Sequence, residues 1–518
     1  MFADDRKRNI LSGGIPLILG FSLFKLVIHL YSNLFANYGI FRDELYYLAC
    51  ADRLALGYVD HPPLSIHILS LWKWIFGENL FVLRFLPALL GALTVLLTGL
   101  IIRRLRGGNL AVIFGCLAVI GAPVMLAMNT TYSMNSFDFF FWTLAMYLCI
   151  AIVQEPHPRL WMLLGLVIGL GLLNKAGVLW LGAGILLAFL FTKNRRQFKT
   201  SGPWAAGGLA ALLFSPFIIW NIFNDFAHLE FIRNATSMKY AGITRLDFIG
   251  GQILLQNPVS LFLWIAGLYY FFFHREGKQY RIVGIVYAVV FAILLINGHS
   301  KPEYLSPIYP ALFAGGAVWL EGTRNRKFPV LLKLFLAVLL VTGGVFLAPV
   351  GLPVLPEAKF GPYIRTLGIS PPSTEGHELE ALPQYYADMH GWRDMARTVS
   401  GVYQTLPEEE RRKTIVFAQN YGEAGAVEYY TSTFDLPPVI CPHNSFWKWS
   451  RPLLSDFETV IVLGRSREDF EPMFESVEEA AVTQSRWAIP YENNLPVYIC
   501  RGFKGDITLF WEQLRTYH

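Results

Sequence analysis

Residues 81–106 read FVLRFLPALLGALTVLLTGLIIRRLR. The stretch from 81 to 102 is almost wholly apolar, and Arg103, Arg104 and Arg106 follow it directly. An α-helix rises about 1.5 Å per residue, so about 20 apolar residues span the roughly 30 Å hydrocarbon core of a bilayer. The stretch therefore predicts a membrane-spanning helix that ends in a basic loop.

Similar apolar runs recur through the first two thirds of the chain. Together they predict an α-helical polytopic membrane protein with about eleven spans. Only Asn174 and Lys175 separate the fifth and sixth runs, which could be two short spans or one broken hairpin. Besides 81–102, the runs lie at 15–36, 109–127, 136–153, 160–173, 176–192, 203–222, 258–274, 282–297, 304–320 and 328–349.

The composition excludes several classes of protein. Charged residues make up 16% of the 518-residue chain, against about 25% in a typical soluble domain, which disfavours a soluble globular enzyme. Residues 1–375 hold 30 Lys and Arg against 17 Asp and Glu, whereas residues 376–518 hold 13 against 21. The positive excess lies in short loops rather than on one polar face, so we expect no nucleic-acid partner. Aromatic content of 15% and only five Cys disfavour disorder and a disulfide-stapled miniprotein.

The distribution of lysine and arginine predicts the orientation in the membrane. Alternate loops are basic, for example 103–106, 193–199 and 275–281. Short basic loops stay on the cytoplasmic side, so we expect a cytoplasmic N-terminus and an external C-terminal part. The predicted domains are a transmembrane domain at 1–350 with a first external loop at 37–80, a linker at 351–383, and an external domain at 384–518.

The external domain alternates predicted helices and strands, which indicates a small α/β layer domain. Cys441 and Cys500 both lie in it, and an external setting would permit a disulfide; two buried free thiols are an equally good alternative. The expected helices are 388–406, 421–432 and 467–475, and the expected strands are 414–419, 460–464, about 481–488 and about 496–500.

The first external loop is the most informative segment for function. It reads FRDELYYLACADRLALGYVDHPPLSIHILSLWKWIFG, residues 41–77, and its apolar spacing predicts two helices that lie on the membrane surface. Asp43 and Glu44 place two carboxylates just after the first span. They could act as a general base and its supporter, as metal ligands together with His61, or as favourable charges at a helix N-terminus.

Other polar residues are expected at the same external boundary. Asp138 follows NTTYSMNSF at the start of a span, and Lys175 and Lys301 lie in external turns. Polar groups at one depth suggest a site for a substrate with charge and hydroxyls, although a solvated or snorkelling span end is the alternative for each. Lys25 and His29 share one face of the first span, and we assign them to structural hydrogen bonds.

Several motifs together resemble one known family. These are DE after the first span, HPPL at 61–64, the Asp138 segment, GLLNKAGVLW at 171–180 and KPEYLSPIYPAL at 301–312. The combination resembles the protein O-mannosyltransferases and the bacterial aminoarabinose transferases of glycosyltransferase superfamily C. The tail lacks the repeats that eukaryotic mannosyltransferases insert, so a bacterial inner membrane with a periplasmic C-terminal domain fits better.

The resemblance implies a mechanism and roles for individual residues. Such enzymes transfer a sugar, with inversion, from a polyprenyl-phosphate carrier to an acceptor outside the membrane, with the first-loop aspartate, here Asp43, as the base. Glu44 and Asp138 would support catalysis. The aminoarabinose transferases have Lys where this chain has His61, so His61 would bind phosphate by hydrogen bonding or the cations elsewhere would do so. The expected donor-phosphate residues are His61, Lys175, Lys301 and Tyr304.

We therefore predict an integral-membrane inverting glycosyltransferase. Its expected partners are a polyprenyl-phosphate sugar, membrane lipids and an envelope glycan, lipid or protein as acceptor. A bound divalent metal ion stays open as a cofactor. The alternatives are a lipid-linked sugar transporter or flippase, and a membrane-anchored interaction protein.

Overall fold

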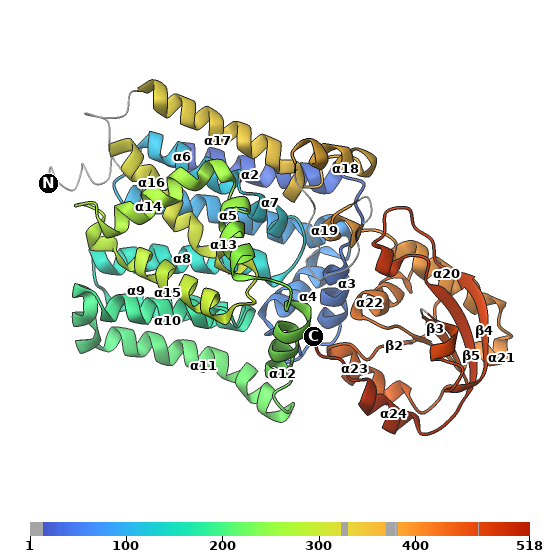
Figure 1. Cartoon of the computed structure of the whole chain (residues 1–518). Coiled ribbons are helices and arrows are strands. Elements are labelled where there is room, and N and C mark those ends of the chain that lie inside the picture. The colour runs from blue at the N-terminus through green and yellow to red at the C-terminus, as the bar shows by residue number, and fades with distance from the viewer. Residues whose placement is uncertain (1–13, 323–329, 369–378, 380–381, 465) are drawn as a thin grey trace. The chain divides into compact units, whose positions relative to one another are not determined.

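The computed structural model describes residues 14–322, 330–368, 379, 382–464 and 466–518 (Figure 1). The chain forms two compact units. Unit 1 comprises Met1–Ala36, Phe76–Ile219 and Tyr240–Val354, and unit 2 comprises Asn37–Ile75, Trp220–Lys239 and Leu355–His518. The predicted domain boundary at residue 350 therefore differs from the compact units, because the first loop belongs to the same unit as the C-terminal residues.

Unit 1 is helical, and within the described residues five helices are long and apolar enough to cross a membrane. These five are α2 (Ile15–Phe35), α5 (Leu80–Arg104), α8 (Met134–Gln154), α11 (Ser201–Phe223) and α17 (Val330–Gly351). Two bent pairs could add one span each: α10 (Val178–Leu190) with Lys193–Lys199, and α13 (Arg245–Leu254) with the segment that contains α14 (Leu261–Phe272). The remaining helices are α6 (Asn109–Ile120), α7 (Pro123–Met128), α9 (Pro158–Asn174), α15 (Ile282–Asn297) and α16 (Tyr309–Gly322).

The helices confirm a polytopic helical fold, but the count of eleven spans stays a prediction. By length and composition the described residues hold five spans, or up to seven with the bent pairs. Several predicted spans are shorter or broken as helices. The run at 109–127, for example, divides between α6 and α7, where Pro123 begins the second helix. Because proline lacks a backbone N–H, it suits the first turn of a new helix better than the interior of a long one.

Close packing in unit 1 explains the polar residues of the first span. A Cβ at Gly99 of α5 would lie 2.5 Å from Ile18 of α2, so the glycine permits close approach of the two helices. The buried Lys25 donates to the Met125 carbonyl at 3.0 Å, and His29 Nδ1 lies 3.4 Å from Thr130 Oγ1. The assignment of Lys25 and His29 to structural hydrogen bonds is thus supported.

Unit 2 contains a five-stranded sheet in the order β2–β1–β3–β5–β4. Strand β1 (Thr414–Phe417) pairs in parallel with β2 (Val439–Ile440) and β3 (Thr459–Leu463), while β5 (Pro496–Phe503) pairs antiparallel with β3 and β4 (Phe474–Val482). The predicted strands at 414–419, 460–464 and 496–500 are present. The predicted helix at 467–475 is wrong: a short 3₁₀ turn at Arg467–Asp469 leads into β4, whose nine residues pair along β5.

The helices of unit 2 come from all three of its chain segments. The first loop gives α3 (Arg42–Ala51) and α4 (Leu64–Phe76), and the second segment gives α12 (Ala227–Asn234). Cys441 and Cys500 are both buried free thiols, so the structure contains the second of the two predicted alternatives and not the disulfide. The C-terminal segment gives α18 (Glu357–Thr366), α19 (Gln384–Ala387), α20 (Trp392–Thr405), α21 (Glu408–Arg411), α22 (Tyr421–Tyr430), α23 (Ser445–Ser450) and α24 (Ile507–Leu514).

Helix α3 is buried rather than spread on a membrane surface. All residues from Glu44 to Ala51 are buried, because α22 packs directly against α3. A Cβ at Gly425 of α22 would lie 2.9 Å from the Leu45 side chain, so this glycine allows the two helices to touch. The prediction of a surface helix is therefore wrong for α3, whereas α4 does expose Leu71, Trp74, Ile75 and Phe76.

Candidate active site

The residues predicted to form the site fall into two groups, one in each unit. Asp43, Glu44 and His61 lie in unit 2, and the group with Asp138, Lys175, Lys301 and Tyr304 lies in unit 1.

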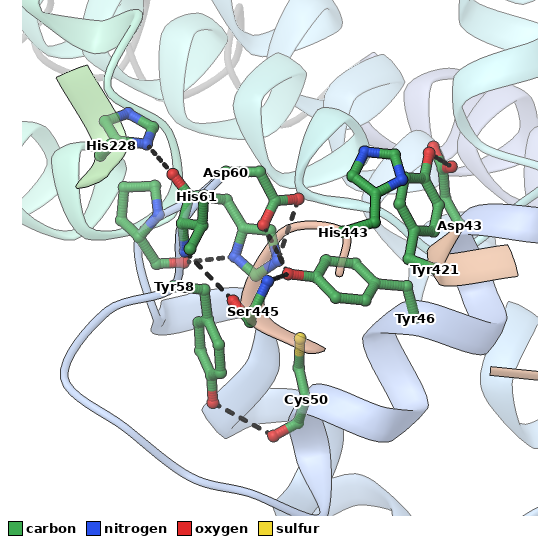
Figure 2. Close-up of polar contacts among 12 residues, drawn as sticks. Asp43, Tyr46, Cys50, Tyr58, Asp60, His61, His228, Tyr421, His443 and Ser445 are labelled. Atoms are coloured by element: carbon green, nitrogen blue, oxygen red, sulfur yellow. Dashed lines mark hydrogen bonds and ion pairs between the residues drawn. The ribbon is translucent and has the colours of Figure 1, made fainter. Parts of the chain in front are cut away.

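Asp43 is a partly exposed carboxylate in the first turn of α3. Its side chain is 38% exposed, in contrast to the buried remainder of the helix. The Tyr421 hydroxyl, at the start of α22, donates to Asp43 Oδ1 at 2.9 Å (Figure 2). Arg42 Nε lies 3.6 Å from the same oxygen. The carboxylate is thus held in place through one oxygen, and Oδ2 can accept a proton from a bound hydroxyl.

Glu44 has a different role from its neighbour. Its side chain is fully buried, and Oε2 accepts a hydrogen bond from the Phe41 backbone N–H at 2.9 Å. This contact satisfies one of the backbone donors that the start of a helix leaves without an intrahelical partner. For Glu44, the alternative of a charge at a helix N-terminus therefore fits the geometry best.

Aromatic and acidic side chains surround His61. Its ring is buried, with Nδ1 3.0 Å from the Pro62 carbonyl and Nε2 3.9 Å from Asp60 Oδ2. The Tyr46 hydroxyl donates to Asp60 Oδ1 at 2.7 Å, and burial next to Asp60 raises the pKa of Tyr46 well above its usual value, so the phenol stays a donor (Figure 2). His228 Nδ1 lies 3.0 Å from the Val59 carbonyl, and burial lowers the pKa of His228.

A polar recess of about 260 Å³ lies beside Asp43. Arg42 and Tyr421, the two residues that contact the Asp43 carboxylate, both line it. Burial lowers the pKa of His443 to about 3, so this imidazole is neutral at ordinary pH and contacts the His518 carbonyl through Nε2 at 2.9 Å. The other lining residues are Met238, Lys239, Asn420, Tyr491, Glu492 and His518. Cations, a carboxylate and amide groups around one recess suit a polar, hydroxylated substrate.

In unit 1 the structure brings three of the predicted residues together. Lys175 Nζ lies 3.4 Å from Asp138 Oδ2, and it donates to Asn135 Oδ1 at 2.8 Å. The same ammonium group lies 5.2 Å from the centre of the Tyr304 ring. The Asp138 carboxylate is buried and paired with a cation, so this group forms a fixed polar cluster in a helical unit.

Lys301 lies on the same chain segment as Tyr304 but has its own neighbours. Its Nζ is 4.6 Å from the Tyr240 ring centre and 3.9 Å from Glu303 Oε1. The backbone N–H of Tyr304 donates to the Lys301 carbonyl, which keeps the two residues in one turn. Their role in binding phosphate stays a prediction.

The candidate metal ligands do not converge. Within the residues that the structure describes, no three His, Cys, Asp or Glu side chains form a group that could hold a metal ion. Glu44 is occupied at the helix cap, and His61 lies beside Asp60 rather than Asp43. Asp43, Glu44 and His61 thus do not form the metal site that the sequence left open.

Sequence reasoning missed several residues near Asp43 and His61. Tyr421 and His443 lie almost 400 residues from Asp43 along the chain, and no local pattern marks either as functional. Tyr46 and Asp60 were within reach, since both lie in the quoted loop between the acidic pair and HPPL. A hydroxyl and a carboxylate in a loop that is predicted to be catalytic are the signals that could have found them.

Comparisons with known proteins agree with the resemblance seen in the sequence. Residues 60–220 match the profile of the family described as dolichyl-phosphate-mannose-protein mannosyltransferase. The lipid A galacturonosyltransferase RgtD of Rhizobium johnstonii is 24% identical over 331 residues, which are 63% of this chain and 68% of RgtD. The undecaprenyl phosphate-alpha-4-amino-4-deoxy-L-arabinose arabinosyl transferase of Pseudomonas aeruginosa is 28% identical over 216 residues, 38% of each chain.

A solved structure shares the fold. The crystal structure of ArnT from Cupriavidus metallidurans bound to undecaprenyl phosphate superposes with a TM-score of 0.60 at 13% identity, over 93% of this chain and 98% of ArnT. At that identity the likeness establishes the fold alone. The resemblance to glycosyltransferases that use lipid-phosphate sugars is confirmed, and the enzyme class predicted from the sequence is the class of these relatives.

Proposed function

We propose that this chain is an integral-membrane glycosyltransferase that moves a sugar from a polyprenyl-phosphate carrier to a hydroxyl of an envelope acceptor. One observation carries the proposal: the Asp43 carboxylate is partly exposed, held by Tyr421 and placed at the edge of a polar recess, on a helix that is otherwise buried. A partly exposed carboxylate can contact a substrate, whereas a fully buried one such as Glu44 cannot.

Asp43 acts as the general base. An acceptor hydroxyl gives its proton to the carboxylate while its oxygen attacks the anomeric carbon of the donor sugar. The bond between that carbon and the carrier phosphate breaks, the configuration inverts, and polyprenyl phosphate leaves. Tyr421 and Arg42 fix the base, so little reorganisation is needed during the attack.

The leaving phosphate needs positive charge, because negative charge develops on it in the transition state. Lys175 and Lys301 are the cations that we assign to it in unit 1, with Tyr304 beside Lys175 as a further hydrogen-bond donor. In unit 2, His61 keeps the position before the first proline, but its buried ring favours an orienting role over a direct charge. Asp138 then serves to hold Lys175.

The acceptor and its side of the membrane belong to the proposal as well. The basic loops favour a cytoplasmic N-terminus and an external C-terminal part, so the transfer takes place on the external, periplasmic face. A reporter enzyme active only in the cytoplasm, fused after Pro383, should be inactive; activity there would reject this orientation. The acceptor is an envelope glycan, lipid or protein, and the similarity to known transferases favours a transferase over a transporter.

The test uses purified protein in nanodiscs, a panel of radiolabelled sugars on undecaprenyl phosphate, and an envelope extract as acceptor. Asp43→Asn keeps the shape of the side chain and removes the proton acceptor, so turnover should fall about 10²–10⁴-fold with donor binding unchanged. The matched control is Asp52→Asn, the same change at an exposed aspartate of the same loop, paired with Lys73, which should stay within threefold of wild type.

Two results would change the assignment. If Asp43→Asn folds, binds donor and still turns over within a few-fold of wild type, Asp43 is not the base and the site must be rebuilt around Asp138. If Asp43→Asn and Glu44→Gln lose similar activity and a divalent cation restores both, the pair binds a metal ion instead.

A further inference from the structure

A second polar cavity of about 470 Å³ lies in unit 2, with lining residues other than those of the recess beside Asp43. Four segments that are distant in sequence form it: the chain just before α3, the start of α20, the end of α22, and the connection between β4 and β5. The side chains that matter are Asn37, Arg393, Tyr430, Ser485, Arg486 and Trp487. Its volume falls in the range of small-molecule sites, which is about 300–1,000 Å³.

Two glycines allow these segments to meet. A Cβ at Gly391 would lie 2.8 Å from the Ala488 side chain, and the glycine has φ +92°, a conformation that other residues rarely adopt. A Cβ at Gly39 would lie 2.6 Å from the Met389 carbonyl oxygen. At these two glycines the segments that line the cavity therefore pack closely against each other, which distinguishes the cavity from a gap between loosely packed loops.

The arginines of the cavity differ from the other arginines of this part of the chain. Residues 376–518 are acidic overall, with 21 Asp and Glu against 13 Lys and Arg. Among the described residues from 382 to 518, every arginine except Arg393 and Arg486 forms an ion pair with a carboxylate. The paired arginines are Arg397, Arg411, Arg412, Arg451, Arg467, Arg501 and Arg515.

The two remaining arginines thus line one cavity together, without a carboxylate partner among the described residues. The acid on the cavity wall, Asp394, is engaged by Arg397 at 3.3 Å. In an acidic region, two guanidinium groups kept apart from the surrounding carboxylates are complementary to an anionic ligand.

Aromatic rings give the second part of the ligand's chemistry. The Arg486 guanidinium carbon lies over the Trp487 ring, 4.7 Å from its centre, and the partly buried Tyr430 lines the same cavity. An aromatic face stacks on the apolar face of a sugar ring, while amide, hydroxyl and guanidinium groups such as those of Asn37, Ser485 and Arg486 bind hydroxyl and carboxylate oxygens.

We propose that this cavity binds an acidic saccharide, a sugar unit that carries a carboxylate or a phosphate. Its further role, to hold a part of the acceptor glycan away from the bond that forms, rests on the proposed glycosyltransferase function. The cavity begins at Asn37–Ile40, only a few residues before Asp43, and an extended chain advances at most about 3.6 Å per residue. Ile40 therefore lies at most about 11 Å, and Asn37 at most about 22 Å, from Asp43, a span that a short oligosaccharide can bridge.

The experiment is a binding titration of the full chain in nanodiscs at low ionic strength, without donor. The probes are digalacturonate, the neutral disaccharide cellobiose, and inorganic phosphate. Digalacturonate should bind at least tenfold more tightly than either of the other two. Arg393→Gln and Arg486→Gln should each weaken its binding by about tenfold or more, since each removes a charge-assisted contact. Trp487→Ala should weaken digalacturonate binding and leave phosphate binding unchanged.

Arg412→Gln is the matched control, because this arginine is exposed in the same unit and pairs with Glu408; digalacturonate binding should not change. The saccharide site is overturned if no probe binds wild type, if the double variant of Arg393 and Arg486 binds digalacturonate as wild type does, or if phosphate binds as tightly as digalacturonate. Sugar transfer is measured separately: binding without transfer would leave the cavity standing and refute the proposed function, and transfer without binding would do the reverse.

Discussion

Tyr421→Phe is the most direct test of how the C-terminal residues position Asp43, the proposed base. The variant removes a single oxygen, the one that donates to Asp43 Oδ1 at 2.9 Å. The ring itself should stay in place, because it packs against the Arg42 guanidinium at 5.4 Å, the Tyr46 ring at 5.0 Å and the His443 ring at 4.9 Å. The loss should therefore be confined to the orientation of the carboxylate.

The size of the loss follows from the exposure of the acceptor. A hydrogen bond to a charged group contributes about 1.5–3 kcal/mol. The Asp43 side chain is 38% exposed, so water can replace part of the phenol contact and the lower end applies. About 1.5 kcal/mol corresponds to roughly a tenfold decrease in rate. We expect kcat to fall about tenfold, while KM for the donor changes less than twofold because the groups assigned to its phosphate are untouched.

The assay is a double-mutant cycle on transfer in nanodiscs. If Tyr421 acts by positioning Asp43, Tyr421→Phe should have no further effect in a protein that already carries Asp43→Asn. Tyr403→Phe, which removes a phenol hydrogen bond to the Arg411 carbonyl outside both recesses, is the control and should leave kcat unchanged. A tenfold loss that recurs in the Asp43→Asn background would show that Tyr421 acts on the structure of the unit, and a loss below twofold would remove it as a positioning residue.

Three further predictions concern stability and the donor. Gly425→Ala places a methyl group 2.9 Å from α3 and should destabilise unit 2 by about 1–3 kcal/mol in denaturant unfolding. The control Gly401→Ala meets no atom within 4 Å and should stabilise unit 2 by about 0.5–1 kcal/mol. Equal effects of the two substitutions would contradict the packing of α3 on α22. Lys301→Ala should weaken binding of undecaprenyl-phosphate sugar about tenfold or more, and unchanged affinity would remove it from the phosphate site. Hydrogen bonds, above all the one from Arg501, lower the pKa of Glu410 below its usual 4.5, so the ionised carboxylate stabilises the fold above that pH and this stabilisation is lost as the pH falls further. Glu410→Gln should therefore reduce the decline of the unfolding midpoint below about pH 4.5, by at most about 1 kcal/mol at this partly exposed site. An unchanged slope would contradict the assignment.

The helices of unit 1 could be predicted because their causes are local. A membrane-spanning helix satisfies its own backbone and needs only a long apolar run, and α5 at Leu80–Arg104 matches the predicted 81–102 closely. The exact division into spans could not be predicted, because helix ends at positions such as Pro123 depend on the neighbouring helices as well as on hydropathy. In the tail, β1, β3 and β5 were predictable from their runs of β-branched residues.

Asp43 was predictable as a candidate base, but its working environment was not. The acidic pair, HPPL and the family resemblance are all properties of the linear sequence. The distinction between Asp43 and Glu44 needed the structure, because only the cap at Phe41 shows which carboxylate is engaged and which is left accessible. The grouping of Lys175 with Asp138 and Tyr304 likewise required the packed helices of unit 1.

The sequence by itself thus determined the class of protein, its apolar helices and the loop that carries the proposed base, since each depends on composition and order within a few tens of residues. Only the tertiary structure decided that α3 is buried, that β4 is a strand, that Tyr421 holds Asp43, and that Arg393 and Arg486 line one cavity. These features are contacts between segments up to almost 400 residues apart. Such contacts depend on the path of the whole chain and on small residues such as Gly425 that permit close approach, and no local pattern encodes them.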